Sequence, residues 1–273
     1  MNRIKYFFIA LSVFCLSNIH ASFVSLYAPE HIQACNGYLK YHSAEQISEY
    51  LQYVENINAK DATDNTLLHK NICSNNIDLI RLLLQAGALL TIEDKLGQTP
   101  LYKLILLAEN EEEAIEILNI CMQYKNLNII ANDEGKTLIH AAVMNKKNKI
   151  LDFLCNYYVE HLEERGMAYI NAFDNYGYTA INECITHNNY AGLTILLNHE
   201  ADPNKTQYSF TPLFEAIRQK NTKAVRILLN DPRTEYKKRK KLGYSNLTPL
   251  DYARSIDGKE KIIKLLEKKT TKK

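Results

Sequence analysis

Histidine and cysteine are the residues through which this sequence could bind a metal ion. His31, Cys35 and His42 come nearest to a cluster. Their spacing matches none of the ligand patterns of zinc sites, and the sequence contains no HExxH, HxH or CxxC motif. We therefore expect no bound metal ion and no cofactor.

Motifs that would support catalysis are also absent. The sequence has no GxGxxG, Walker-type phosphate loop or GxSxG pattern. The acidic residues Glu111, Glu112, Glu113 and Glu116 are typical of a solvated first helical turn, where carboxylates favour the positive end of the helix dipole. We therefore expect no enzymatic activity and no small-molecule substrate.

A run of basic residues has several interpretations. It consists of Lys237, Lys238, Arg239, Lys240 and Lys241. The run is typical of a solvated loop, of a nuclear-import-like signal, or of a patch that binds anionic lipid, acidic protein or nucleic acid. We treat these residues as a candidate basic patch, and we do not expect a nucleic-acid partner.

The first 21 residues have the three parts of a secretory signal peptide. Arg3 and Lys5 make a basic start, residues 6–16 form an apolar run of 11, and Ala21 is a small residue that signal peptidase accepts. A membrane-spanning helix needs roughly 20 apolar residues, which this run does not reach. We expect a periplasmic or secreted protein that meets the membrane only through its transient signal peptide.

Removal of this signal leaves five cysteines, an odd number that cannot all pair within one chain. Cys73, Cys121, Cys155 and Cys184 lie in segments with a helical pattern, where a free cysteine behaves as a small apolar residue. A disulfide framework is therefore not expected, and a single internal bridge stays open as an alternative in an oxidising compartment.

Charge is divided unequally along the mature chain. Residues 22–204 contain 12 basic and 24 acidic residues, whereas residues 205–273 contain 19 basic and 7 acidic residues. An acidic body thus adjoins a basic end, although their net charges cancel in the sum. Such asymmetry indicates a partner or surface that binds in one orientation.

A short phrase, threonine followed by two apolar residues, recurs along the chain. It starts at Thr66, Thr99, Thr137, Thr179, Thr211 and Thr248, at intervals of 33, 38, 42, 32 and 37 residues. Threonine is a good helix cap, and the prolines at 100, 212 and 249 fall where a missing N–H costs nothing. A polar break and a second amphipathic segment follow, as in residues 77–85.

This phrase resembles the ankyrin repeat, whose first helix starts with T-P-L-H-x-A. Residues 61–93 align with the family pattern without a gap, and looser copies extend the resemblance over roughly residues 45–268. The resemblance implies an all-α solenoid of stacked helix-turn-helix units with hairpin loops. Leu83 and Leu228 should lie in the core that neighbouring repeats share.

The predicted organisation has four parts. They are the signal peptide 1–21, an N-terminal arm 22–43, the ankyrin-repeat domain 44–269 and a basic tail 270–273. A partial repeat, with a helix in 44–58, should precede six repeats that start near residues 61, 94, 132, 174, 206 and 243. Extra residues should lengthen second helices or turns in 119–130 and 155–170, and form a hairpin in 234–246.

Proteins with ankyrin repeats usually bind partners through the hairpin tips and the concave face of the first helices. The matching positions here are Lys95, Asp133, Glu134, Lys136, Met144, Tyr176, Tyr178, His187, Tyr208, Phe210 and Arg218. The four aromatic residues among them should form one exposed cluster of the kind that dominates interface energies. Packing between neighbouring hairpins is the alternative. His69 and His140 should tie helices and loops together by hydrogen bonds.

We therefore expect a monomeric, exported protein–protein interaction module without chemistry of its own. The Lys-, Asn- and Ile-rich composition suits an AT-rich genome, so a bacterial protein directed at host cells is favoured. A periplasmic scaffold, or a protective partner of an exported enzyme, is the alternative function.

The signal peptide provides the first testable prediction. The exported protein should begin at Ser22, because the basic, apolar and small-residue regions occur in the required order. Mass spectrometry of the N-terminal peptide from secreted material measures this directly. An intact Met1 terminus on protein that stays in the cytosol would contradict the prediction.

Overall fold

The computed structural model describes residues 43–271, except 53, 55, 75, 125–131, 163, 208–209, 243–244 and 257–258. The predicted signal peptide, nearly all of the predicted N-terminal arm and the last two residues lie outside this range. So do Tyr208 and the cluster of His31, Cys35 and His42.

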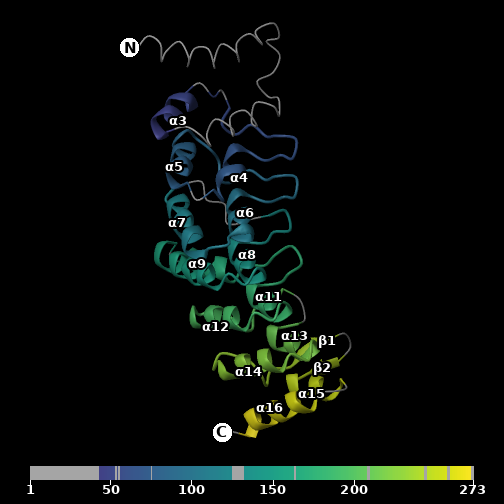
Figure 1. The fold of residues 1–273 in the computed structure, drawn as a ribbon. Coiled ribbons are helices and arrows are strands. Elements are labelled where there is room, and N and C mark those ends of the chain that lie inside the picture. Colours follow the sequence, from purple (N-terminus) through teal and green to yellow (C-terminus); the bar gives the residue numbers. More distant parts are fainter. Residues whose placement is uncertain are drawn as a thin grey trace, which may run out of the picture.

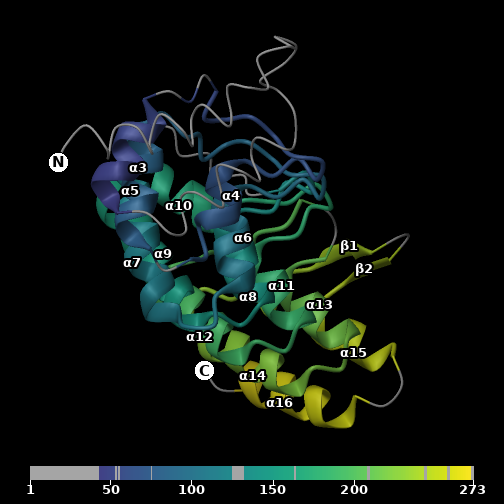
Figure 2. The ribbon, with the colours of Figure 1, turned by 45° about the horizontal axis from the view of Figure 1, so that its top comes forward.

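The helices form two layers that run along the whole stack (Figures 1 and 2). The first helices of the repeats are α4 (Leu67–Asn71), α6 (Pro100–Leu107), α8 (Leu138–Met144), α11 (Ala180–Thr186), α13 (Pro212–Arg218) and α15 (Pro249–Arg254). The second helices are α3 (Ala44–Leu51), α5 (Ile77–Gln85), α7 (Glu111–Met122), α9 (Asn148–His161), α12 (Tyr190–Asn198), α14 (Thr222–Asn230) and α16 (Glu260–Thr271). Helix α3 belongs to the partial repeat that the sequence predicts.

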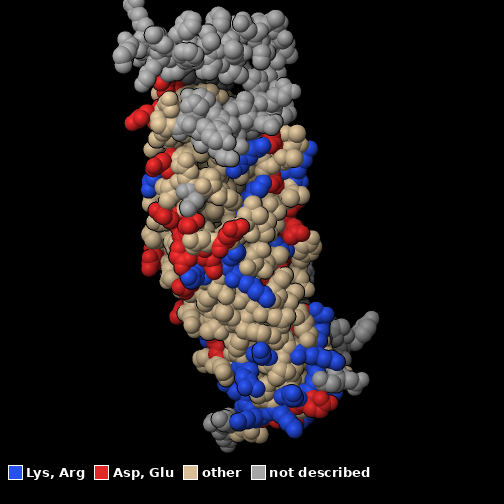
Figure 3. All heavy atoms as spheres, viewed as in Figure 1, with Lys and Arg blue, Asp and Glu red and all other residues tan. Residues whose placement is uncertain are grey.

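Charge is distributed along the stack as the sequence indicates (Figure 3). Basic side chains gather over the C-terminal end, around α14 and α16, and acidic side chains gather beside α7 and α9. The acidic first turn of α7 contains Glu111, Glu112 and Glu113, in agreement with the sequence interpretation. The two signs therefore face solvent on different parts of the molecule.

Threonine begins the first helices, as the repeated phrase predicts. The side chains of Thr66 and Thr137 each accept a hydrogen bond from a backbone N–H three residues later, at 3.4 Å. Pro100, Pro212 and Pro249 each lie in the first turn of their helix. These caps satisfy donors that a helix start leaves unpaired, so each repeat starts its first helix at a defined residue.

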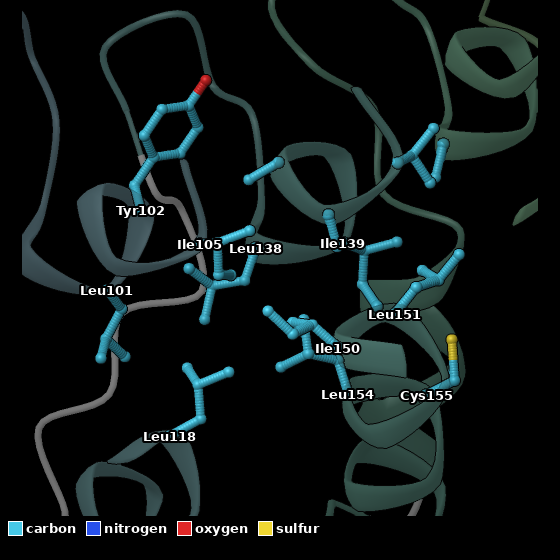
Figure 4. Close-up of a cluster of buried hydrophobic side chains, with 14 of the residues drawn as sticks. Leu101, Tyr102, Ile105, Leu118, Leu138, Ile139, Ile150, Leu151, Leu154 and Cys155 are labelled. Atoms are coloured by element: carbon cyan, nitrogen blue, oxygen red, sulfur yellow. The ribbon is translucent and has the colours of Figure 1, made fainter. Parts of the chain in front are cut away.

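One apolar core runs between the two layers (Figure 4). Ile105 of α6, Leu118 of α7 and Leu138 of α8 point toward one another from three helices. Leu83 and Leu228, which the sequence places in the core, are both fully buried. The predicted sharing of one core between neighbouring repeats is thus confirmed.

Two of the three predicted insertions can be located, whereas most of the one predicted in 119–130 lies outside the described residues. Helix α9 has 14 residues, and an additional helix, α10 (Glu164–Ile170), follows and packs against it. The approach is close enough that a Cβ at Gly166 would lie 2.1 Å from the carbonyl oxygen of Tyr158. Strands β1 (Lys240–Leu242) and β2 (Ser245–Leu247) form an antiparallel hairpin in the otherwise helical fold.

Two second helices, α5 and α12, are followed by a left-handed residue. Gly87 after α5 has φ +89°, as its sequence position indicates. Glu200 has φ +61° at the corresponding position after α12, where it replaces the usual glycine. A residue with a Cβ pays about 1 kcal/mol or more for this conformation, so the departure from the repeat pattern carries a local cost in stability.

Asparagine side chains join each repeat to the next. The Nδ2 of Asn58 donates to the carbonyl of Gly87 at 3.0 Å, and its Oδ1 accepts from the N–H of Leu89 at 2.8 Å. The Oδ1 of Asn171 accepts in the same way from the N–H of Asp202, at 2.8 Å. These bonds fix the register between repeats that the apolar core alone would leave less defined.

The cysteine prediction is confirmed for three residues and wrong for one. Cys121, Cys155 and Cys184 are free and buried among apolar side chains, and burial raises the pKa of each thiol. Cys73 is exposed, because α4 ends before it and leaves it in the turn between the two helices. Within the described residues, no helix combines the length and apolar character that crossing a bilayer requires.

The shared core predicts a specific loss of stability. Leu83→Ala should lower the free energy of unfolding by about 2 to 5 kcal/mol, since it leaves a cavity between repeats. Leu96 is 70% exposed at a hairpin tip, so Leu96→Ala is the matched control and should cost about 0.5 kcal/mol or less. Urea denaturation of both variants gives the comparison. Equal midpoints would be incompatible with the core position of Leu83.

Candidate partner-binding site

Tyr176 and Tyr178 are held at the tip of the hairpin that precedes α11. The Oδ1 of Asp174 accepts hydrogen bonds from the backbone N–H of both tyrosines, at 2.9 Å each. Gly177 between them has φ +79°, which glycine adopts without strain. The hairpin is therefore rigid, yet the tyrosine side chains are 58% and 38% exposed.

This hairpin stacks on the preceding one. The backbone N–H of Asn175 donates to the carbonyl of Glu134 at 2.9 Å, and its Nδ2 donates to the carbonyl of Asp133 at 2.8 Å. A Cβ on Gly135 would lie 2.3 Å from the Oδ1 of Asn175. Glycine at 135 therefore allows the approach that brings the third and fourth hairpins together.

A hollow of about 250 Å³ lies between these hairpins and the first helices. Its lining comes from three successive repeats and consists of Lys136, Asp174, Tyr176, Tyr178, Glu183, Thr186, Glu215, Arg218 and Gln219. Four of the residues selected from the sequence, Lys136, Tyr176, Tyr178 and Arg218, meet here. The structure thus gathers part of the predicted partner-binding set in one place.

Lys136 forms the floor of the hollow. It is buried, and its Nζ lies 3.0 Å from Glu134, 3.2 Å from Asp174 and 3.6 Å from Glu183. Burial alone would lower the pKa of Lys136, but Glu134 and Asp174 hold that pKa above its ordinary value. Lys136 thus lines the hollow as a buried residue that joins the third repeat to the fourth, and its contact with a partner stays a prediction.

Glu183 is shared between two neighbours. One carboxylate oxygen faces Lys136, and the other lies 3.1 Å from the Nδ1 of His187, which is half-buried. Burial raises the pKa of Glu183 although Lys136 and His187 lie close. The negative charge of Glu183 is therefore less well compensated than the charge of a solvated carboxylate would be.

Glu215 occupies the same place one repeat later. Its carboxylate accepts from the Nε and Nη2 of Arg218 at 2.9 and 2.6 Å, and from the Nε2 of Gln219 at 2.6 Å. Burial alone would raise the pKa of Glu215, but these donors hold it below its ordinary value. Arg218 itself is exposed, in agreement with its selection from the sequence.

Phe210 does not join the two tyrosines. Its ring packs edge-on against Phe214 at 6.5 Å and Tyr252 at 5.8 Å between centroids. No ring contact between Phe210 and Tyr176 or Tyr178 occurs among the described residues. Phe210 thus packs between repeats, which is the alternative that the sequence left open, and Tyr208 lies outside the described residues.

The remaining selected residues that the structure describes do not line the hollow. Lys95, Asp133 and Glu134 are exposed on hairpins, and Met144 is half-buried at the end of α8. In the basic patch, Arg239 lies 3.7 Å from Asp251 and Lys238 lies 2.9 Å from Glu235. Part of the positive charge of the patch is thus neutralised within the chain.

Sequence reasoning missed Glu183 and Glu215, although a signal was present. Both residues stand four positions after the capping threonine, at Thr179 and Thr211. The same place holds Lys70 in the copy at Thr66. Reading this column through successive copies would have placed two carboxylates side by side on the groove.

His69 and His140 tie first helices to the following hairpin, as expected. The Nδ1 of His140 accepts from the N–H of Thr137 at 3.2 Å, which leaves Nε2–H to donate to the carbonyl of Tyr178 at 3.2 Å. His69 makes the same bonds, with Gln98 as the acceptor at 3.0 Å. His140 therefore helps to hold the tyrosine hairpin in place.

No group of three potential metal ligands occurs within the part of the chain that the structure describes. His31, Cys35 and His42 lie outside it, so their arrangement stays a matter of sequence alone.

Comparisons with known proteins agree with this architecture. A family model described as "Ankyrin repeats (3 copies)" matches residues 104–207, and an "Ankyrin repeat" model matches residues 63–95. The two matches together span half of the chain. Repeats of this family indicate a protein–protein interaction module.

Curated relatives found for the chain are viral. An ankyrin repeat protein of vaccinia virus (strain Copenhagen), OPG189, is 26% identical over 176 residues, which are 64% of this chain and 28% of the viral protein. The chain thus matches less than a third of that relative's length. These relatives do not support the bacterial origin that the composition favours.

Solved structures share the fold. The ankyrin repeat domain of Bcl-3 superposes with a TM-score of 0.67 at 20% identity, over 85% of this chain and 97% of that domain. A second match is a chain from the complex of the Bd0816 predatory endopeptidase of Bdellovibrio bacteriovorus with immunity protein Bd3460. It superposes with a TM-score of 0.51 at 21% identity, over 71% of this chain and 95% of that chain. Identities this low show a common fold and nothing about function.

The buried imidazole of His140 predicts a pH dependence of stability. Burial lowers the pKa of His140 from 6.5 to about 4. Between pH 4 and pH 6.5 this imidazole therefore takes up a proton more readily in the unfolded chain than in the folded one. The stability that the neutral imidazole contributes is complete above about pH 6.5 and is lost as the pH falls toward 4. At pH 5 this loss lowers the free energy of unfolding by about 2 kcal/mol.

Urea denaturation at pH 7.5 and pH 5 measures the effect against a matched variant. Asn182 is the residue that corresponds to His140 in the next repeat, and its Oδ1 accepts a hydrogen bond from the hydroxyl of Thr179 at 2.9 Å. An asparagine at position 140 should therefore fit. The wild-type chain should lose more stability than His140→Asn over this range. Identical losses would show that His140 does not resist protonation in the folded state.

Proposed function

Because this chain belongs to the ankyrin-repeat family, we propose that it binds a partner protein in the groove between its hairpins and first helices. One observation carries the proposal. Tyr176 and Tyr178 are exposed on a rigid hairpin, directly beside a hollow that three repeats line.

Exposed tyrosines on a rigid support are suited to protein recognition. A tyrosine buries a large area on binding and loses little side-chain freedom, and aromatic residues with arginine dominate interface energies. The hydrogen bonds from Asp174 and the stacking of Asn175 order the hairpin before any partner arrives. Binding to this site therefore carries a low ordering cost.

The charge pattern supports an oriented complex. Basic residues gather over the C-terminal end of the stack (Figure 3). Tyr176 and Tyr178 lie in the fourth of six repeats, between the acidic α7 and that end in the order of the chain. In this proposal the tyrosines supply affinity, whereas the charges on either side guide the partner and set its direction. The basic patch then acts mainly on the rate of association.

The proposed setting of this interaction is outside the cell that makes the protein. An exported module without its own chemistry, directed at a host protein, accounts for the signal peptide together with the repeat domain. The alternative is a periplasmic scaffold or a protective partner of an exported enzyme. Locating the mature chain in periplasm, medium or host cell distinguishes these two functions.

Tyrosine removal provides the test of the groove. With a partner captured by the mature chain, Tyr176→Ala and Tyr178→Ala should each weaken binding by about 2 kcal/mol while the melting temperature stays unchanged. Val159 is 48% exposed on a second helix, so Val159→Ala is the control and should bind as the wild type does. Calorimetric titration of purified proteins measures all three.

Two outcomes would contradict this assignment. Normal binding by both tyrosine variants would place the interface elsewhere. A tyrosine variant that melts early would show that the ring packs within the protein. Neutralising residues 237–241 should instead reduce the association rate and its salt dependence, because that patch acts at long range.

A further inference from the structure

The hollow beside the tyrosines carries more negative than positive charge. Three carboxylates, those of Asp174, Glu183 and Glu215, line it together with two cations, Lys136 and Arg218. Arg218 is committed to Glu215 through two hydrogen bonds. Lys136 faces the other two lining carboxylates, and Glu183 has a second neighbour in the imidazole of His187. Among the side chains that line the hollow, negative charges therefore exceed the positive charges of Lys136 and Arg218.

Burial makes this deficit costly. The fully buried Asp174 already accepts from two backbone N–H groups and from Lys136. The side chain of Glu183 is only 10% exposed, so water compensates little of its charge. An ionised carboxylate in such surroundings gains more from an arriving cation than an exposed one does. The hollow is thus better prepared for a cation than for an anion or a neutral group.

The tyrosines add a second preference for a cation. The Nζ of Lys136 already lies 5.2 Å from the centroid of the Tyr176 ring, a distance at which an aromatic face attracts positive charge. The hollow, of about 250 Å³, is lined by side chains of three repeats, and a long side chain can enter it.

We propose that the hollow binds an arginine side chain of the partner protein, stacked on Tyr176 or Tyr178 and hydrogen-bonded to the carboxylate of Glu183. This inference rests on the proposed function, because it names the chemistry of what enters the same groove. Arginine fits better than lysine, since its planar guanidinium can stack on a ring and donate two parallel hydrogen bonds to a carboxylate at the same time.

A peptide pair tests the proposal without knowledge of the partner. The probes are acetyl-Gly-Gly-Arg-Gly-Gly-amide and the same peptide with citrulline, which keeps the shape of arginine and removes its charge. Ring resonances of the tyrosines, assigned with Tyr176→Phe and Tyr178→Phe, are followed by NMR during titration. The arginine peptide should shift both rings saturably, with at least about tenfold higher affinity than the citrulline peptide.

Substitution of carboxylates shows which of them binds the arginine side chain. Glu183→Gln should weaken binding of the arginine peptide about tenfold, which is the range of a lost charge-assisted hydrogen bond. Glu116 is exposed on α7, so Glu116→Gln is the matched control and should have no effect. The wild-type comparison of arginine with citrulline remains decisive if Glu183→Gln folds poorly.

Three results would overturn the inference. They are equal affinity for the arginine and citrulline peptides, the absence of any shift in both tyrosine rings, and unchanged arginine binding by a folded Glu183→Gln variant. If any of them occurred while Tyr176→Ala still lost its captured partner, the groove would remain the binding site and only the arginine assignment would fall.

Discussion

No pair of helices in this chain can cover its own apolar face, and the rest of the structure depends on that constraint. Ile105, Leu118 and Leu138 become buried only because consecutive repeats press together (Figure 4). Polar groups then define how the repeats meet. Asn58 and His140 each bond to the backbone of a following repeat. A slip in register would leave the buried imidazole of His140 without its acceptor. Apolar burial supplies stability, and hydrogen bonds supply register.

The parts of the fold that sequence predicts are those with local causes. Threonine caps, first-turn prolines and a left-handed Gly87 depend on residues within one turn of the chain, so the repeated phrase locates them. The insertion in 155–170 was also predictable, because the repeated threonine phrase occurs on both sides of it and the interval between the two copies is longer than the usual repeat. Tyr176 and Tyr178 could be selected for the same reason, since position in the repeat determines which side chains reach the tip of a hairpin.

Contacts between repeats were not predictable in the same way. Lys136, Tyr178 and Phe210 hold one position, immediately before a capping threonine, yet only Tyr178 is exposed. Lys136 is buried because Asp174, 38 residues later, faces it. Phe210 is half-buried because Tyr252 of the last repeat offers a ring to pack against. Each outcome depends on the neighbouring copy, which the pattern of a single repeat does not contain.

Helix α10 gives the molecule one place where its length can evolve. It rests on α9, with Gly166 against the backbone of Tyr158, while the hairpins before and after it remain stacked through Asn175. Residues gained or lost behind the groove therefore leave the spacing of its tyrosines and carboxylates unchanged. Descendants of this protein could diverge in size on that side and in partner on the other, because separate segments of the chain govern the two properties.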